Sequence, residues 1–208
     1  MKKIEAYPNI ETAMRTLDNG GRFYNLLAKA NNKVITQAEL GKVAGLFNDK
    51  QKMMLYLELA IRNLSPGMKS ILLSKLTPEL LQNYEKYRPQ YLLPSAAEQN
   101  GVLGNNVILK GIPKLTDAKT ELSGFVMVPI MAGKTMTMVM IPIMDKYEVY
   151  ELRDEHNGEQ FFIAHAKGEQ KLPEQHLTIA GLIKELKPNK KGDQPSKKFL
   201  EAIYYLEG

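Results

Sequence analysis

Six lysines near the C-terminal end offer the clearest chemistry in the sequence. They lie between residues 184 and 198 together with only Glu185 and Asp193, so the local charge is +4. Lysines in such a loop can meet phosphate groups, and aromatic side chains beside them can stack on bases. The candidate ligand-binding residues are the lysines Lys184, Lys187, Lys190, Lys191, Lys197 and Lys198 and the aromatic residues Tyr147, Tyr150, Phe161 and Phe162.

The distribution of charge favours a plainer interpretation of that loop. The chain has 28 Lys/Arg and 23 Asp/Glu, a formal charge of +5. The first 100 residues hold 14 and 9 of these, and the remaining 108 hold 14 and 14. Electrostatic attraction dominates nucleic-acid binding, and the half that carries the lysines is neutral. A solvated lysine loop is therefore favoured over a binding loop.

Patterns for catalysis and metal binding are missing from the sequence. The absence of cysteine excludes disulfides, thiolate metal ligands and cysteine nucleophiles. His156, His165 and His176 have no partner at metal-ligand spacing, so surface or internally bonded histidines are expected. Ala132–Thr135 has the Gly-Lys-Thr tail of a P-loop, but Val128 occupies the place of the first glycine. We expect no catalytic residue, no metal site, no cofactor and no enzyme activity.

Methionines are concentrated in one predicted hairpin. Six of the eleven lie in it: Met127, Met131, Met136, Met138, Met140 and Met144. Alternation of Met and β-branched residues over 136–141 makes both faces of the second strand apolar, so we expect both faces to be covered. One face would belong to the core, and the other would meet the helical half or a second chain. Thioethers suit an adaptable interface, although core filling is favoured.

The first half predicts five or six short helices. Asn9, Asn48 or Asp49, Ser65 and Thr77 stand at helix starts, the last two before proline. Thr36 and Glu39 form a capping-box pattern. The helix after it is expected to bury four apolar residues, Leu40, Val43, Leu46 and Phe47.

The second half changes to a period of two. Strands are predicted over 107–112, 122–131, 135–143, 147–153, 160–166, 177–186 and 199–206, with Asn157-Gly158 as the strongest hairpin turn. Residues 92–106, rich in Pro, Ala and Asn, are expected to be a linker. The predicted domains are thus a helical domain (1–91), a linker (92–106) and a β-domain (107–208), the last a closed or nearly closed antiparallel barrel.

Two segments resemble known families. Phe23–Phe47 resembles an EF-hand, with Glu39 at the twelfth loop position, but Ala28 and Ala30 occupy the first and third positions, where calcium needs side-chain oxygens. An ordinary helix–turn–helix is preferred.

Residues from about 122 to 206 resemble an OB-fold, on glycines inside two strands, a central hairpin and a closing strand. This resemblance implies that the lysine loop joins the fourth and fifth strands and lines a ligand groove.

Together these features predict an α+β protein, an N-terminal helical bundle followed by an antiparallel OB-like β-barrel. The expected function is a non-enzymatic binding module, in its sharpest form for single-stranded nucleic acid. The alternative is a protein-interaction or assembly protein that uses the Met-rich hairpin and the helical bundle. No secretory signal or apolar span is present, so we expect a cytoplasmic protein without a membrane partner.

Overall fold

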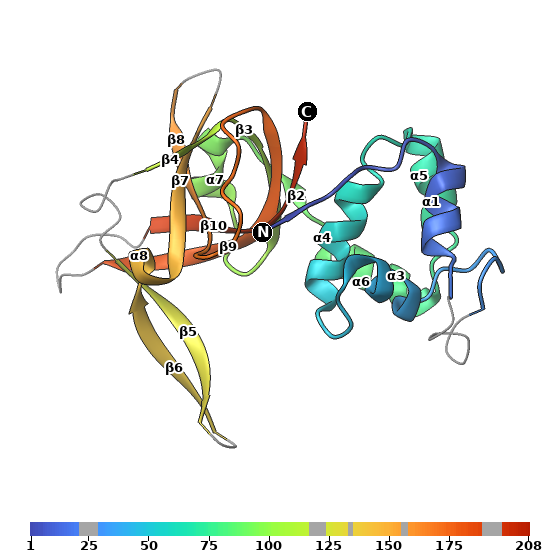
Figure 1. The fold of residues 1–208 in the computed structure, drawn as a ribbon, viewed down its shortest axis with the longest axis horizontal. Coiled ribbons are helices and arrows are strands. Elements are labelled where there is room, and N and C mark those ends of the chain that lie inside the picture. The colour runs from blue at the N-terminus through green and yellow to red at the C-terminus, as the bar shows by residue number, and fades with distance from the viewer. Residues whose placement is uncertain (21–28, 117–123, 133–134, 155–157, 189–196) are drawn as a thin grey trace. The chain divides into compact units, whose positions relative to one another are not determined.

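The computed structural model describes residues 1–20, 29–116, 124–132, 135–154, 158–188 and 197–208 (Figure 1). The chain divides into two compact units. The helical unit contains Lys2–Gln90 and Tyr204–Leu206. The sheet unit contains Met1, Tyr91–Ile203 and Glu207–Gly208. The fold is thus a mixed α/β fold, with helices concentrated in one unit and strands in the other.

Five helices make up most of the helical unit: α1 (Ile10–Leu17), α3 (Gln37–Ala44), α4 (Lys50–Ala60), α5 (Pro66–Leu73) and α6 (Pro78–Tyr87). Helix α4 is the centre of the core, since every residue from Met53 to Ala60 is buried. Strand β1 (Lys2–Lys3) pairs in parallel with Tyr204 and Tyr205 at the end of β10. The last strand of the chain therefore contributes Tyr204–Leu206 to the helical unit.

Most predicted helix caps are confirmed. The side chains of Asn9, Asp49 and Ser65 accept amides at the starts of α1, α4 and α5. Thr36 and Glu39 form both bonds of the capping box. Thr77 is the exception, because its side chain makes no cap bond and its backbone amide is held by the carbonyl of Ile35.

The expected burial of Phe47 is wrong. The helix after Thr36 ends at Ala44, where Gly45 adopts a left-handed conformation, so Phe47 lies beyond it and is 52% exposed. The EF-hand resemblance gains no support, and residues 23–28 of its segment lie outside the described residues. The carboxylate of Asp18 accepts the amides of Asn32 and Lys33 at 3.1 and 2.6 Å. This loop therefore directs N–H donors at an acid, whereas a calcium loop directs oxygens at a cation.

The expected linker is part of the sheet unit. It contains α7 (Pro94–Asn100), in which Ala97 is fully buried. The hydroxyl of Ser95 donates to the buried carboxylate of Asp154 at 2.5 Å, which ties the first turn of the helix to the strands. Small residues let this helix pack closely, so a composition typical of loops forms an ordered element here.

The sheet unit contains the remaining strands. They are β3 (Asn106–Gly111), β4 (Pro113–Leu115), β5 (Gly124–Ala132), β6 (Thr135–Pro142), β7 (Tyr147–Arg153), β8 (Gln160–Ala166), β9 (Leu177–Pro188) and β10 (Lys197–Glu207). A short helix, α8 (Ile143–Lys146), joins β6 to β7, and β2 (Gln90–Tyr91) lies where the chain leaves the helical unit. The predicted β7–β8 hairpin is confirmed, with an antiparallel register from Tyr147↔Ala166 to Arg153↔Gln160.

The prediction was a closed or nearly closed antiparallel barrel, and the described strands form a sheet that is not closed and contains a parallel pair. The path runs β2-β3-β9-β10-β8-β7-β4, and β3 and β4 are not paired with each other in the part of the chain that is described. The β10–β8 pair is parallel, and β9 lies on the far side of β10, so β10 and not β9 is the neighbour of β8. Strands β3 and β4 are separated only by Ile112, so one continuous segment pairs with β9 through its first part and with β7 through its second. With β7, β8 and β9 it forms a Greek-key arrangement.

Candidate functional site

Strand β6 of the β5–β6 hairpin carries a run of exposed apolar side chains. Figure 1 shows the hairpin extending away from the other strands of the sheet unit. Met136, Met138 and Met140 are 66, 51 and 52% exposed, and Val139, on the opposite face, is 37% exposed. Neither face of β6 is thus covered at these positions by the described part of the chain, and cover by a second chain stays a prediction. No charged residue occurs in Gly124–Ala132 or Thr135–Pro142.

The base of the hairpin is fixed to the core. Val126 is 5% exposed and packs in a cluster with Ile143, Val149, Leu186 and Phe199. Strand β5 also pairs with β9 at Gly124↔Pro188 and Phe125↔Lys187. The core therefore holds the base of the hairpin in place, while the apolar side chains of β6 farther along the hairpin remain exposed to solvent.

The four predicted lysines that the structure describes lie on two strands. Lys184 and Lys187 lie on β9, and Lys197 and Lys198 lie on β10, while Lys190 and Lys191 fall outside the described residues. Lys184 contacts the carboxylate of Glu201 at 3.5 Å. The backbone amide of Lys198 donates to Glu98 at 3.1 Å, and its ammonium group donates to the Glu98 carbonyl at 2.7 Å. Lys187 and Lys197 are exposed.

The predicted aromatic platform is absent from the surface. Tyr147, Tyr150 and Phe161 are 8, 1 and 2% exposed, and Phe162 is half-buried against the core cluster around Val126. The Tyr147 hydroxyl donates to Glu201 at 2.8 Å. Burial raises the pKa of this phenol, and the neighbouring Glu201 carboxylate raises it further. Three of the four rings are core side chains, so bases have no access to their faces.

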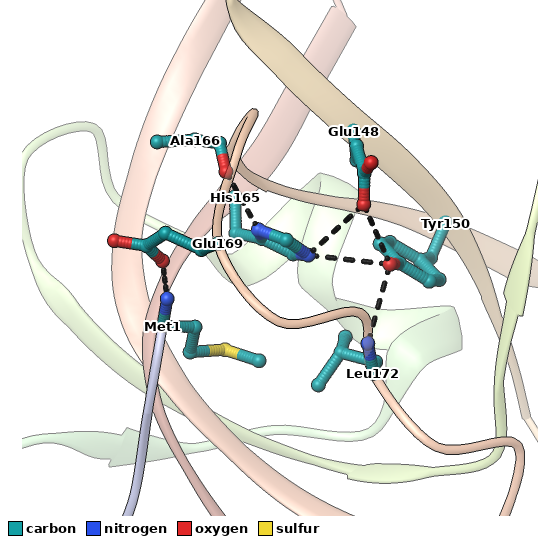
Figure 2. A network of polar contacts seen from close by, with 7 residues as sticks. All are labelled: Met1, Glu148, Tyr150, His165, Ala166, Glu169 and Leu172. Carbon is teal, nitrogen blue, oxygen red and sulfur yellow. Dashed lines mark hydrogen bonds and ion pairs between the residues drawn. The ribbon is translucent and has the colours of Figure 1, made fainter.

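A buried polar network links β7 to β8 and to the segment that follows it (Figure 2). The Tyr150 hydroxyl lies 3.2 Å from Nε2 of His165 and 3.2 Å from the Glu148 carboxylate, and it accepts the Leu172 amide at 3.2 Å. Nδ1 of His165 donates to the Ala166 carbonyl at 2.9 Å, which leaves Nε2 as the acceptor of the neutral ring. The two rings stack with centroids 5.4 Å apart.

Burial sets the protonation of this network. It lowers the pKa of the His165 imidazole, against the opposing effects of the Ala166 carbonyl and the Glu148 carboxylate. Burial, offset by the Leu172 amide, raises the pKa of Tyr150 to about 12. Every polar atom of the His165 ring has a protein partner, so the expectation of an internally bonded histidine is confirmed for this residue. His176 is exposed, and His156 lies outside the described residues.

The sequence interpretation missed the Glu148–His165 contact. Their side chains approach to 3.7 Å and are opposite each other in the β7–β8 register. The predicted strands ending at Arg153 and starting at Gln160 already contain this pairing, because antiparallel partners keep a constant sum of residue numbers. Counting back from the turn would have found it.

An open depression of about 500 Å³ lies beside α7, lined by Pro94, Ser95, Glu98, Gln99, Gly158, Glu159 and Gln160. Its hydroxyl and carboxylate side chains could hold a small polar ligand. Ser95, however, gives its proton to Asp154, and Glu98 accepts the Lys198 amide. The Ser95 hydroxyl and the Glu98 carboxylate are thus already hydrogen-bonded to other residues of the fold.

The described residues lack both a metal-binding group and a helix that could span a membrane. They contain no group of three or more His, Asp and Glu side chains that could hold a metal ion. None of their helices has the length and apolar character required to cross a membrane.

Comparisons with known proteins give no family. No family model matches the chain, and no curated protein matches it. One similar solved structure is the N-terminal domain of an archaeal MCM, with 10% identity over 83% of this chain and 84% of that chain and a TM-score of 0.35. A likeness at this score carries no argument about function.

Proposed function

We propose that the chain is a non-enzymatic binding module whose contact surface for a protein partner is the β5–β6 hairpin. The observation that carries the proposal is the exposure of Met136, Met138, Met140 and Val139 on strands without a charged residue. Methionine is enriched at protein interfaces, and its flexible thioether adapts to a partner's shape. Exposed apolar groups gathered on one element favour a partner that removes them from water.

A photo-cross-linking amino acid at position 138 tests this function. The chain carrying it is expressed in its native cell, and cross-linked products are identified by mass spectrometry. The control carries the same group at Met68, which is 41% exposed on α5. Discrete protein adducts at 138 that are missing at 68 support the proposal. Equal, diffuse labelling at both positions would reject it.

A second candidate function is binding of single-stranded nucleic acid by an OB-like barrel. We propose that the sheet unit is such a barrel, supported by its partly open Greek-key order over five strands. The hairpin is then an insertion between the first and second strands, and the lysines flank the connection of the fourth and fifth. These are the two connections that bind oligonucleotides in many OB-folds. The Phe125↔Lys187 pairing brings them together.

Fluorescence anisotropy of labelled single-stranded DNA and RNA at two salt concentrations tests this second function. Binding that weakens steeply with salt and is lost when Lys187, Lys190 and Lys191 become Ala would support it. The matched control replaces Lys50, Lys52 and Lys69 of the helical unit with Ala. No binding at low salt rejects it. The protein-contact function ranks first, because three candidate aromatic rings are buried and the β-rich half is neutral.

A further inference from the structure

The backbone groups of β6 divide into two sets that point in opposite directions. Residues facing each other in an antiparallel pair alternate between hydrogen-bonded and non-hydrogen-bonded pairs. Pro129 lies opposite Met138, and proline has no N–H to exchange. The Pro129↔Met138 pair is therefore non-hydrogen-bonded, as are Met131↔Met136 and Met127↔Met140, two positions away on each side. In these pairs the backbone N–H and C=O point away from the partner strand.

The outer edge of β6 is consequently an open hydrogen-bonding edge. It presents the backbone groups of Met136, Met138 and Met140, and in the described part of the chain β6 pairs with β5 alone. Natural edge strands are protected by charges, prolines or bulges. Between 135 and 141 the strand has no charge and no proline, and its register with β5 has no bulge. The outer edge of β5, in contrast, carries Pro129.

We propose that this edge pairs with the same edge of a second copy of the chain, antiparallel, about a two-fold axis at Met138. The inference rests on the proposed function and names the partner. A neutral strand meets its own copy without like-charge repulsion, and edge-to-edge pairing satisfies the outward backbone groups of both copies. The pairing continues the sheet from one hairpin into the other.

The sequence of β6 is complementary to itself in this register. Centred on Met138, the pairing sets Met136 opposite Met140 and Thr137 opposite Val139, so methionines gather on one face and β-branched residues on the other. About six backbone hydrogen bonds form between the copies, two at each hydrogen-bonded pair. Centring at Met140 would place Pro142, which lacks an N–H, opposite Met138. The register centred on Met138 therefore forms more backbone hydrogen bonds between the copies than the register centred on Met140.

Cysteine cross-linking tests the register, because the chain has no cysteine of its own. In a hydrogen-bonded pair the Cα atoms lie about 5.5 Å apart, which is within disulfide range. Met138→Cys should form a disulfide-linked dimer under mild oxidation. Met136→Cys is the matched control. Met136 is more exposed, but its copy lies four residues away along the strand, roughly 13 Å, so it should remain uncross-linked.

Sedimentation of the unmodified chain completes the test. A mass that doubles with concentration, together with cross-linking at least tenfold faster for Met138→Cys than for Met136→Cys, supports the inference. A monomer at all concentrations, or equal cross-linking of both variants, overturns it. A hairpin that binds a different protein would appear as a monomer with discrete photo-cross-links at 138. That result rejects the second copy and leaves the proposed function intact.

Discussion

Pro129 lies opposite Met138 in the β5–β6 hairpin, at a position where neither residue bonds to the other strand. Proline at 138 should therefore preserve the hairpin, because the lost N–H pointed outward. Proline at Val139, opposite Val128 in a hydrogen-bonded pair, should disrupt it by removing an internal bond, a cost of about 0.5–1.5 kcal/mol at this exposed position. Amide exchange of β5 is the measurement. Equal protection in both variants would contradict this alternation.

The buried imidazole of His165 should make stability depend on pH. Its folded pKa lies below the unfolded value of about 6.5, so the unfolded chain takes up a proton that the folded chain refuses. Stability is therefore lost as pH falls below about 6.5, by up to roughly 1.4 kcal/mol per pH unit.

Urea unfolding between pH 7.5 and 5.5 measures that slope. His165→Gln should show a shallower loss than the unmodified chain, while replacement of the exposed His176 by Gln should keep the original slope. The groups that face His165, the Glu148 carboxylate, the Tyr150 phenol and the Met1 amino group, remain in all three proteins. Identical slopes for the unmodified chain and His165→Gln would show that the ring is protonated in the fold.

Ser95→Ala should destabilise the sheet unit by about 1–3 kcal/mol, because it removes a hydroxyl that donates to the buried carboxylate of Asp154. Ser74→Ala is the control. Its hydroxyl donates to the Ile71 carbonyl at an exposed site, so little stability should be lost. Chemical denaturation of the three proteins gives the comparison. A cost at Ser95 no larger than at Ser74 would mean that water or another group replaces the hydroxyl.

Thr36→Ala should cost about 1 kcal/mol through loss of the capping box at α3. Thr77→Ala should cost less than half as much, because the Thr77 side chain makes no cap bond although it also stands at a helix start. Thermal unfolding followed by helical circular dichroism distinguishes the two. Similar costs at both positions would indicate that the loss comes from packing of the threonine methyl group.

Local structure was predictable wherever a short-range pattern determines it. The alternation of apolar residues located the strands, and hydroxyl or carboxyl side chains before apolar runs located most helix starts. Long-range order was not predictable in this way. The parallel β8–β10 pair depends on β9 passing to the far side of β10, which no local period encodes. The close approach of β9 to β10 explains why position 181 is a glycine. A Cβ added there would lie 2.1 Å from the Glu201 carbonyl oxygen on β10.

The candidate site was predictable only in part. The sequence predicts the Met-rich hairpin but not its exposure. An apolar strand has the same sequence pattern whether another element covers it or it faces solvent. Tyr147 and Tyr150 were candidates for stacking on bases because their strand lies beside the lysine loop in the predicted barrel. Their hydroxyls instead bond to Glu201 and to the His165 network inside the sheet unit.

Residue-resolved amide exchange of β6 tests the central claim most directly. The amides of Thr137 and Val139 bond within the hairpin and should be protected at every concentration. Those of Met136, Met138 and Met140 should exchange quickly in dilute protein and become protected as concentration rises, with Met138→Pro abolishing the gain at the two remaining amides. Outward amides that exchange quickly at every concentration, and also when a cross-linked partner is bound, would contradict the assignment of this edge as the contact surface.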